Sequence, residues 1–261
     1  MKLRSLLRPV LGRERAVWRL LPWPGLRLRF FHDGIDCVIF SLLVSQRRVF
    51  FIQIGSHDGR AGDPLWTFRR YRNWRGILVE PVDYLFHRLV QNYSPWRQRF
   101  TFENAAIAGE GGARTFHYLA QNDELAEGYD QLGSFDRELL LRHTQYFPGA
   151  ETRVVSGWVN CLTWRELCEK HHAKEIDLLH IDAEGSDREI LEQVDLTRYQ
   201  PRVMLYEHIH MAAAEQRETA ERLDRAGYEF VRIGIDTLAV RSSALTTMPA
   251  LARAWQLITL K

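Results

Sequence analysis

The sequence predicts an α/β fold built on an open, mostly parallel sheet. From residue 49 onward, short apolar runs typical of buried strands alternate with segments of helical periodicity. Several of these runs end on acidic or small residues, and the carboxyl ends of parallel strands meet at one sheet edge, where ligands bind. Two alternating segments near the C-terminus predict a closing antiparallel hairpin.

Composition sets broad limits on the class of protein. The 261 residues are enough for one large domain, and 46% hydrophobic and 26% charged residues are ordinary for a globular protein. A formal net charge of +2 gives no reason to expect a nucleic-acid partner. The three cysteines lack C-x-x-C spacing, which argues against a structural zinc site and suits a reducing compartment. Without an apolar run of ~20 residues or the apolar core of a secretory signal, a cytoplasmic protein is expected.

Residues 1–48 are predicted to form a basic N-terminal arm that ends in a lead-in helix at residues 33–45. The arm holds ten lysines and arginines against three acids, with leucines and tryptophans between them, and its prolines prevent one long helix. Such a segment can lie on an anionic membrane surface or bind a partner protein. The simpler alternative, which we favour, is an arm packed on its own domain with its arginines in water. Residues 49–261 would then form the main domain.

The first strand is predicted at residues 49–54, and a glycine-bracketed turn follows it. This turn comprises Gly55, Ser56, His57, Asp58 and Gly59. A strand that ends in a turn of small residues can place backbone N–H groups around a ligand. The G-x-x-x-G spacing differs from the G-x-G-x-x-G of dinucleotide sites and disfavours an NAD-linked oxidoreductase. A first crossover helix is expected at residues 64–71.

The second strand, residues 76–79, ends on Glu80 and Pro81. In nucleotide-binding α/β folds an acid at this point accepts hydrogen bonds from both ribose hydroxyls, a task that suits the two oxygens of a carboxylate. Pro81 ends the strand because its φ is fixed and it lacks an N–H. The alternative is that Glu80 is a solvated strand end. The sequence favours a ribose-binding acid.

The middle of the chain interrupts the strand–helix alternation. A helix at residues 84–93 and a third strand at 100–103 precede a segment, residues 108–160, that is predicted to be an insertion. Residues 114–119 alternate like an edge strand, and residues 153–161 alternate again. Long functional loops commonly interrupt rigid scaffolds, so this insertion is a candidate lid or substrate wall.

The second half of the chain returns to the alternating pattern. Two S/T-x-x-E patterns, Thr163 to Glu166 and Ser186 to Glu189, are capping boxes that predict helix starts. The remaining expected elements are strands at residues 176–182 and 203–206, a helix that ends at 226, and a hairpin of 228–235 with 237–241.

Acids and histidines gather at the predicted strand exits. They are Asp58, Glu80, Asp182, Glu184, Glu207, His208 and His210. Taken singly, each is most simply a solvated strand end, but their convergence on one edge favours a ligand site. Asp182, Glu184 and His208 are also a candidate set for a divalent cation, although the chain has no H-x-x-x-H or H-E-x-x-H motif.

Four segments read together resemble the FkbM family of S-adenosylmethionine-dependent methyltransferases. They are FIQIGSHDG, GILVEP, NAAI and IDLLHIDAEGSDREIL, and the resemblance covers roughly residues 49–208. It implies a class I methyltransferase fold, a seven-stranded sheet whose last strand is antiparallel. It also implies S-adenosyl-L-methionine as cofactor and O-methylation, commonly of a sugar or another natural-product hydroxyl. His180 stands where the family often has lysine, and a serine-rich element of the family is reduced here to the Gly-Ser-Phe at 133–135.

The resemblance also implies roles for individual residues. The turn from Gly55 to Gly59 would wrap the methionine part of the cofactor, Glu80 followed by Pro81 would hold the ribose, and Asn104 and Ala105 would flank the adenine. Asp182 and Glu184 would lie near the sulfonium and the acceptor. Ser134 and His210 are candidate substrate-binding residues.

Methylation of an aliphatic hydroxyl requires removal of its proton. A carboxylate with a pKa near ~4 is a poor base for an alcohol, whereas a histidine titrates near neutrality. His208 is therefore the expected general base, with Asp182 and Glu184 shaping the site; a metal ion on the two acids could acidify the hydroxyl instead. The competing reading is a non-catalytic scaffold or binding module in a glycan or lipid pathway.

Overall fold

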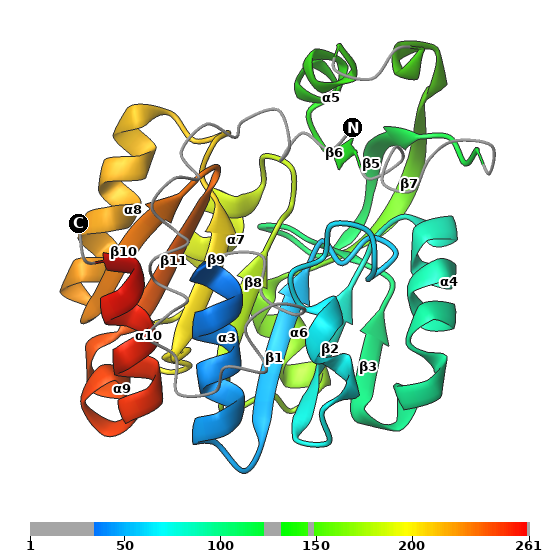
Figure 1. The fold of residues 1–261 in the computed structure, drawn as a ribbon. Coiled ribbons are helices and arrows are strands. Elements are labelled where there is room, and N and C mark those ends of the chain that lie inside the picture. Colours follow the sequence, from blue (N-terminus) through cyan, green and yellow to red (C-terminus); the bar gives the residue numbers. More distant parts are fainter. Residues whose placement is uncertain (1–33, 123–131, 146–148, 260–261) are drawn as a thin grey trace.

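The computed structural model describes residues 34–122, 132–145 and 149–259, and within them a seven-stranded sheet forms the centre (Figure 1). The strand order is β10-β11-β9-β8-β1-β2-β3. Six strands run in the same direction, whereas β11 is antiparallel to its neighbours β9 and β10. This confirms the open, mostly parallel sheet with an antiparallel C-terminal hairpin. The strands are β1 (Val49–Ile54), β2 (Trp74–Val79), β3 (Phe100–Glu103), β8 (Leu178–Ile181), β9 (Val203–Glu207), β10 (Tyr228–Ile233) and β11 (Asp236–Arg241).

Strand β1 lies where the order of the sheet reverses. Its neighbours are β2 on one side and β8 on the other, so the chain progresses outward in both directions from β1. Ligands bind at such a switch point, outside the carboxyl ends of the strands. The apolar run of β1 is buried because helices cover both faces of the sheet.

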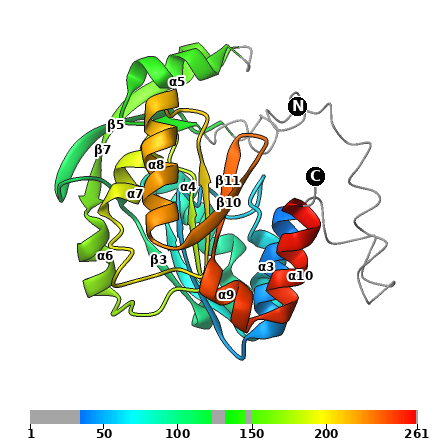
Figure 2. The same cartoon turned by 90° about the vertical axis from the view of Figure 1, so that its left-hand side faces the viewer.

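Helices form a layer on each side of the sheet (Figure 2). One apolar core joins the sheet to α3 (Gly34–Ser45), α4 (Asp83–Asn92) and α10 (Pro249–Thr259). The second core joins the opposite face to α6 (Trp164–Lys170), α7 (Asp187–Gln193) and α8 (Ala213–Arg225). The remaining helical pieces are α9 (Ser242–Thr247) and the 3-10 turns η3 (Trp66–Arg70), η4 (Ser94–Arg99) and η5 (Ala150–Arg153). The sequence pattern anticipated α3, but not α9 or α10.

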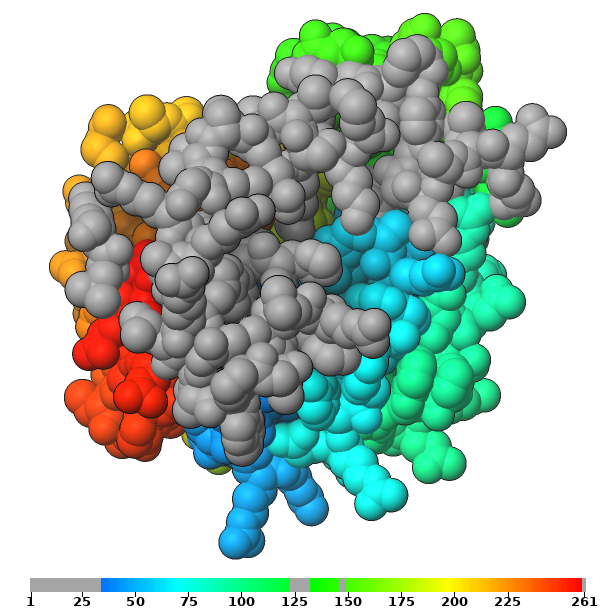
Figure 3. Space-filling model, in the orientation of Figure 1, coloured from blue at the N-terminus to red at the C-terminus, as the bar shows by residue number. Residues whose placement is uncertain are grey.

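A second, smaller sheet rises above the carboxyl edge of the main one (Figure 1). In the space-filling view, green residues from this part of the chain are visible at the top of the molecule (Figure 3). Its order is β4-β7-β5-β6, and helix α5 (Arg137–Thr144) follows β6. We call strands β5, β6 and β7 with α5 the projection. The prediction of β5 as an edge strand was wrong, because β5 lies between β7 and the two residues of β6. The strands are β4 (Ala106–Ile107), β5 (Gly112–Leu119), β6 (Gly133–Ser134) and β7 (Val154–Leu162).

Three further predictions about helices have different outcomes. The capping box of α6 is confirmed: the Glu166 N–H donates to Thr163 Oγ1 at 3.2 Å, and the Thr163 N–H donates to Glu166 Oε2 at 2.7 Å. The second box was wrong. Ser186 has helical backbone angles and makes no side-chain cap, and Glu189 Oε1 instead accepts the Gly109 N–H at 2.6 Å. The expected crossover helix at residues 64–71 is only the 3-10 turn η3.

Most of the predicted basic arm, residues 1–33, lies outside the described residues. The arm and the domain boundaries drawn from it stay predictions. In the described ranges, none of the helices is long and apolar enough to cross a membrane.

Candidate active site

A pocket of about 490 Å³ lies at the carboxyl edge of the main sheet, between the end of β1 and the projection. Gly55, His57 and Glu80 line it from the main sheet, and Phe116 and Phe135 line it from the projection. The position at the switch point is the one expected for a ligand of this fold.

Gly55 is the point where the ends of β1 and β8 come closest. Its φ is +75°, and a Cβ at this position would lie 1.8 Å from the backbone oxygen of Asp182. The neighbouring strands fix the approach, since the Asp182 N–H donates to Ile54 O at 3.0 Å and the Gly55 N–H donates to Val79 O at 3.1 Å. Only glycine fits there without a shift of the backbone.

Glu80 holds the glycine-bracketed turn through its buried carboxylate. Oε2 accepts the His57 N–H and Oε1 accepts the Val82 N–H, both at 2.8 Å. Burial raises the pKa of Glu80, and the neighbouring His57 opposes that rise. Each carboxylate oxygen can accept a second hydrogen bond, so the side chain keeps acceptor capacity toward the pocket it lines. The predicted ribose acid thus lies beside the turn, and its contact with ribose stays a prediction.

The other predicted cofactor residues divide into two groups. Asp58 Oδ1 accepts the N–H groups of Arg60 and Ala61 at 2.8 and 2.9 Å, and Asn104 Nδ2 donates to Glu80 O at 3.0 Å, so these side chains stabilise the turn and the strand end. Ser56 is buried, and Gly59, at φ +66°, packs beneath Leu89 and Tyr93. The group that lines the pocket directly consists of Gly55, His57, Glu80, Pro81, Ala105 and Asp182.

His57 is the basic side chain on this wall. Burial lowers its pKa, but the carboxylates of Glu80, Asp182, Glu184 and Asp58 raise it, and the net pKa is above the ordinary value for histidine. The imidazole therefore offsets part of the negative charge that the strand exits bring together.

Glu184 marks the opposite end of the pocket, where the main sheet meets the projection. Ser134 of β6 donates its hydroxyl to Glu184 O at 2.8 Å and so fixes the loop after β8. Glu184 has a φ of +47°, an uncommon conformation for a residue with a side chain. Ser134, which was predicted to bind the substrate, thus donates a hydrogen bond to the backbone of this loop.

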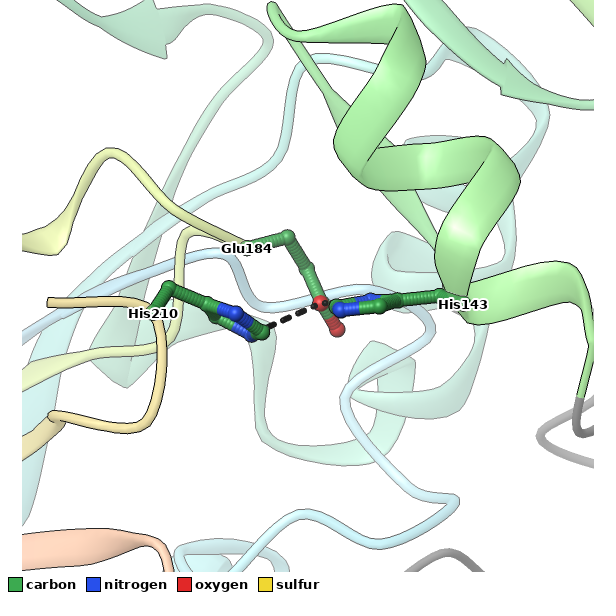
Figure 4. Close-up of side chains that lie close together, drawn as sticks. All are labelled: His143, Glu184 and His210. Atoms are coloured by element: carbon green, nitrogen blue, oxygen red, sulfur yellow. Dashed lines mark ion pairs between the residues drawn. The ribbon is translucent and has the colours of Figure 1, made fainter.

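Two histidines flank the carboxylate of Glu184 (Figure 4). His143 Nδ1, from α5, lies 3.4 Å from Glu184 Oε2, and His210 Nε2, from the loop after β9, lies 3.8 Å from the same oxygen. The two imidazole rings are 4.6 Å apart between centroids. The three side chains are 14%, 16% and 13% exposed, in the order His143, Glu184, His210. We call them the His–Glu–His cluster.

Glu207, the last residue of β9, adds a buried acid beside the cluster. Its Oε2 is 3.0 Å from His210 Nε2. Burial, followed by the negative charges of Asp182, Glu184 and Asp187, raises the pKa of Glu207 to about 11. Asp187 is buried as well and accepts the N–H groups of Ala183 and Glu207, both at 3.2 Å. Acidic side chains are therefore concentrated at the exits of β8 and β9.

His208 lies away from this cluster. Its Nδ1 is 3.0 Å from Thr237 Oγ1 on β11, and its pKa is lowered by burial and by Arg232. Among the described residues, the ligand atoms that converge belong to the His–Glu–His cluster and not to the predicted set Asp182, Glu184 and His208. The reason is the turn after β9, closed by the Met211 N–H to His208 O at 3.1 Å, which carries His210 back toward Glu184.

Sequence reasoning missed His143 and gave no role to Glu207 beyond that of a strand-exit acid. His143 lies inside α5 with no motif around it, so no local signal marks it. Glu207 could have been found, because a buried strand that ends on an acid next to two histidines is visible in the sequence. The catalytic role given to His208 stays a prediction.

Comparisons with known proteins identify the family. The FkbM methyltransferase domain model matches residues 53–230. The FkbM methyltransferase of Methylobacillus flagellatus KT is 11% identical, with a TM-score of 0.47 over 74% of this chain, and the match spans 43% of that chain. A methyltransferase of Geobacter sulfurreducens is 11% identical, with a TM-score of 0.43, and the match covers 91% of this chain and 94% of that chain. An O-methyltransferase of Bacillus cereus in complex with SAH is also 11% identical, with a TM-score of 0.41, and the match covers 87% of this chain and 96% of that chain. No curated protein matches the sequence. Because the family match covers most of the chain and includes the turn, Glu80 and the cluster residue Glu184, the protein belongs to the FkbM methyltransferase domain family.

Proposed function

We propose that the protein is an S-adenosyl-L-methionine-dependent O-methyltransferase that acts on a hydroxyl of a sugar, a polysaccharide or another natural product. Family membership supports methyl transfer in general. The observation that carries the proposal is the single pocket that joins the turn and Glu80 at one end to Glu184 at the other. A donor and an acceptor held in one pocket can meet in line, and such alignment supplies much of the catalysis.

The residues at the first end fit the cofactor. Val82, Leu85 and Ala105 give an apolar wall for an adenine ring, and the buried Glu80 carboxylate has acceptor capacity for ribose hydroxyls. Asp182 and Glu184 also line the pocket, and their negative charge favours a sulfonium. When bound, S-adenosyl-L-methionine supplies a methyl group that is already activated by the positive sulfur.

The residues at the second end fit a hydroxyl acceptor. The His–Glu–His cluster can bind a hydroxyl and take up its proton, which an alcohol must lose on methylation. Phe116 and Phe135 pack edge to face, 5.0 Å between ring centroids, and give the pocket an apolar wall that suits the C–H face of a sugar ring. His208 was the base expected from the sequence, but it contacts Thr237, so we assign proton removal to the cluster.

The test is methyl transfer by the purified full chain. S-adenosyl-L-methionine with a labelled methyl group would be incubated with nucleotide sugars, glycan fragments and phenolic natural products, and the product methyl located by mass spectrometry and NMR. Label on an oxygen of one acceptor class is expected. Label on nitrogen or carbon would refute O-methylation, and a chain that fails to bind the cofactor would favour the scaffold reading.

A further inference from the structure

The His–Glu–His cluster has the donor set of a transition-metal site. His143, Glu184 and His210 each offer one ligand atom, and these atoms all lie within 4.8 Å of one another. Two imidazoles and a carboxylate suit borderline divalent ions such as Zn²⁺, Fe²⁺ or Mn²⁺ and leave positions open for other ligands. Ligand atoms about 2.0–2.1 Å from a tetrahedral ion are about 3.3 Å apart. The two separations from Glu184 Oε2, 3.4 and 3.8 Å, are close to this value, and the three ligand atoms all lie within 4.8 Å of one another.

Glu207 provides a second, independent observation. Its side chain is 8% exposed, and within the described residues its Oε2 is buried without a hydrogen-bond partner. The contact of this oxygen with His210 Nε2, at 3.0 Å, lacks hydrogen-bond geometry. A buried polar oxygen without a partner is costly, and a cation beside it would provide one.

The charge around the cluster points to the same kind of ligand. Asp182 and Asp187 lie on the loop and helix start after β8, next to Glu184 and Glu207. Acidic side chains grouped in this way favour a cation among them. A divalent ion bound by Glu184, His143 and His210 would have three protein ligands, the number that catalytic zinc sites commonly have, and Glu207 would lie beside one of them.

We propose that His143, Glu184 and His210 bind one divalent transition-metal ion at the acceptor end of the pocket, with Glu207 beside His210. Glu184 lines the pocket, so an open position of the ion faces the acceptor. There the ion would bind the acceptor hydroxyl and lower its pKa, so that the proton can leave to water while the histidines stay bound to the ion. This deepens the proposed O-methylation and rests on it. The binding of the ion itself does not rest on the reaction.

The experiment uses the full chain freed of metal by a chelator and then titrated with Zn²⁺ or Mn²⁺ in a calorimeter. One ion per chain is expected. His143→Ala and His210→Ala should each weaken binding about 100-fold or more. His87→Ala is the matched control, because His87 is exposed on α4 and contacts Asp83 O; it should bind like the wild type. Thermal unfolding without metal checks that every variant folds.

Cobalt gives a readout that does not depend on stability. Co²⁺ bound to imidazole and carboxylate ligands absorbs visible light, and this band should appear in the wild type and in His87→Ala but not in the two cluster variants. Equal affinity of the wild type and the cluster variants would overturn the site. Full methyl transfer by the metal-free protein would overturn the catalytic use of the ion but leave the proposed function intact. Cation binding without any methyl transfer would refute only the proposed function.

Discussion

Exchange of Glu80 for glutamine tests the donor end of the pocket. The change keeps the size of the side chain and one acceptor oxygen, but it replaces the other oxygen by an NH₂ group that cannot accept. Both oxygens are in use, since the carboxylate accepts the N–H groups of His57 and Val82 at 2.8 Å. In Glu80→Gln one of these buried donors must therefore face an amide N–H.

The magnitude follows from the hydrogen bonds that are lost. A hydrogen bond to a charged group contributes about 1.5–3 kcal/mol, and a buried donor left unpaired costs about 1–3 kcal/mol of stability. If Glu80 also accepts from the ribose, the variant loses one of two such bonds to the cofactor. We expect S-adenosylhomocysteine to bind about 10- to 150-fold more weakly, from about 1.5–3 kcal/mol at 1.4 kcal/mol per factor of ten.

Calorimetry with a deoxyribose analogue of S-adenosylhomocysteine separates ribose recognition from loss of the turn. The wild type should bind the analogue more weakly than the parent compound, and Glu80→Gln should discriminate less between the two. Glu110→Gln, an exposed acid in the loop after β4, is the control and should behave as the wild type. A folded Glu80→Gln variant that discriminates as strongly as the wild type would refute the assignment of Glu80 to the ribose.

Three further predictions concern stability and can be checked by chemical denaturation. Gly227→Ala should lower the free energy of unfolding by about 1 kcal/mol, since it adds only strain at positive φ. Gly55→Ala should lower it several times more, because its methyl group would meet a backbone carbonyl at 1.8 Å. Equal losses would contradict that close approach. Burial raises the pKa of Asp63 from 3.8 to about 7. The folded protein thus keeps a proton that the unfolded chain loses, so the free energy of unfolding should fall as pH rises from about 4 to 7, by at most about 1.4 kcal/mol per pH unit. Asp63→Asn should remove this slope. Parallel pH profiles of the variant and the wild type would disprove this role of Asp63. Thr163→Ala removes a helix cap and should lower the free energy of unfolding by about 1 kcal/mol. Ser186→Ala removes no cap and should change it by less than about 0.5 kcal/mol. Similar losses in the two variants would be inconsistent with a cap at Thr163 and none at Ser186.

The donor end of the pocket could be predicted because its signals are local. The apolar run of β1, the glycine at its end and the acid at the end of β2 are each contiguous in the chain, and parallel pairing places them side by side without further information. The close approach of Gly55 to Asp182 is the structural reason for the glycine that the pattern marked.

The acceptor end depends on contacts that no local pattern encodes. His143 reaches Glu184 only because α5 packs on the loop after β8, and the choice between His208 and His210 depends on one turn. The failed capping box has a similar cause, since Glu189 pairs with Gly109, which is distant in sequence. Tertiary contacts of this kind override local preference.

The separate origins of the two ends have a consequence for how the family can diversify. Gly55, Glu80 and the turn between them belong to the main sheet, whereas Ser134, His143, Phe116 and Phe135 all belong to the segment at residues 108–160. Replacing that segment with its counterpart from another member should therefore change which compound is methylated while leaving affinity for the methyl donor nearly constant. A new acceptor could then be accommodated by changes in one stretch of the chain, while Gly55, Glu80 and the turn between them stay as they are.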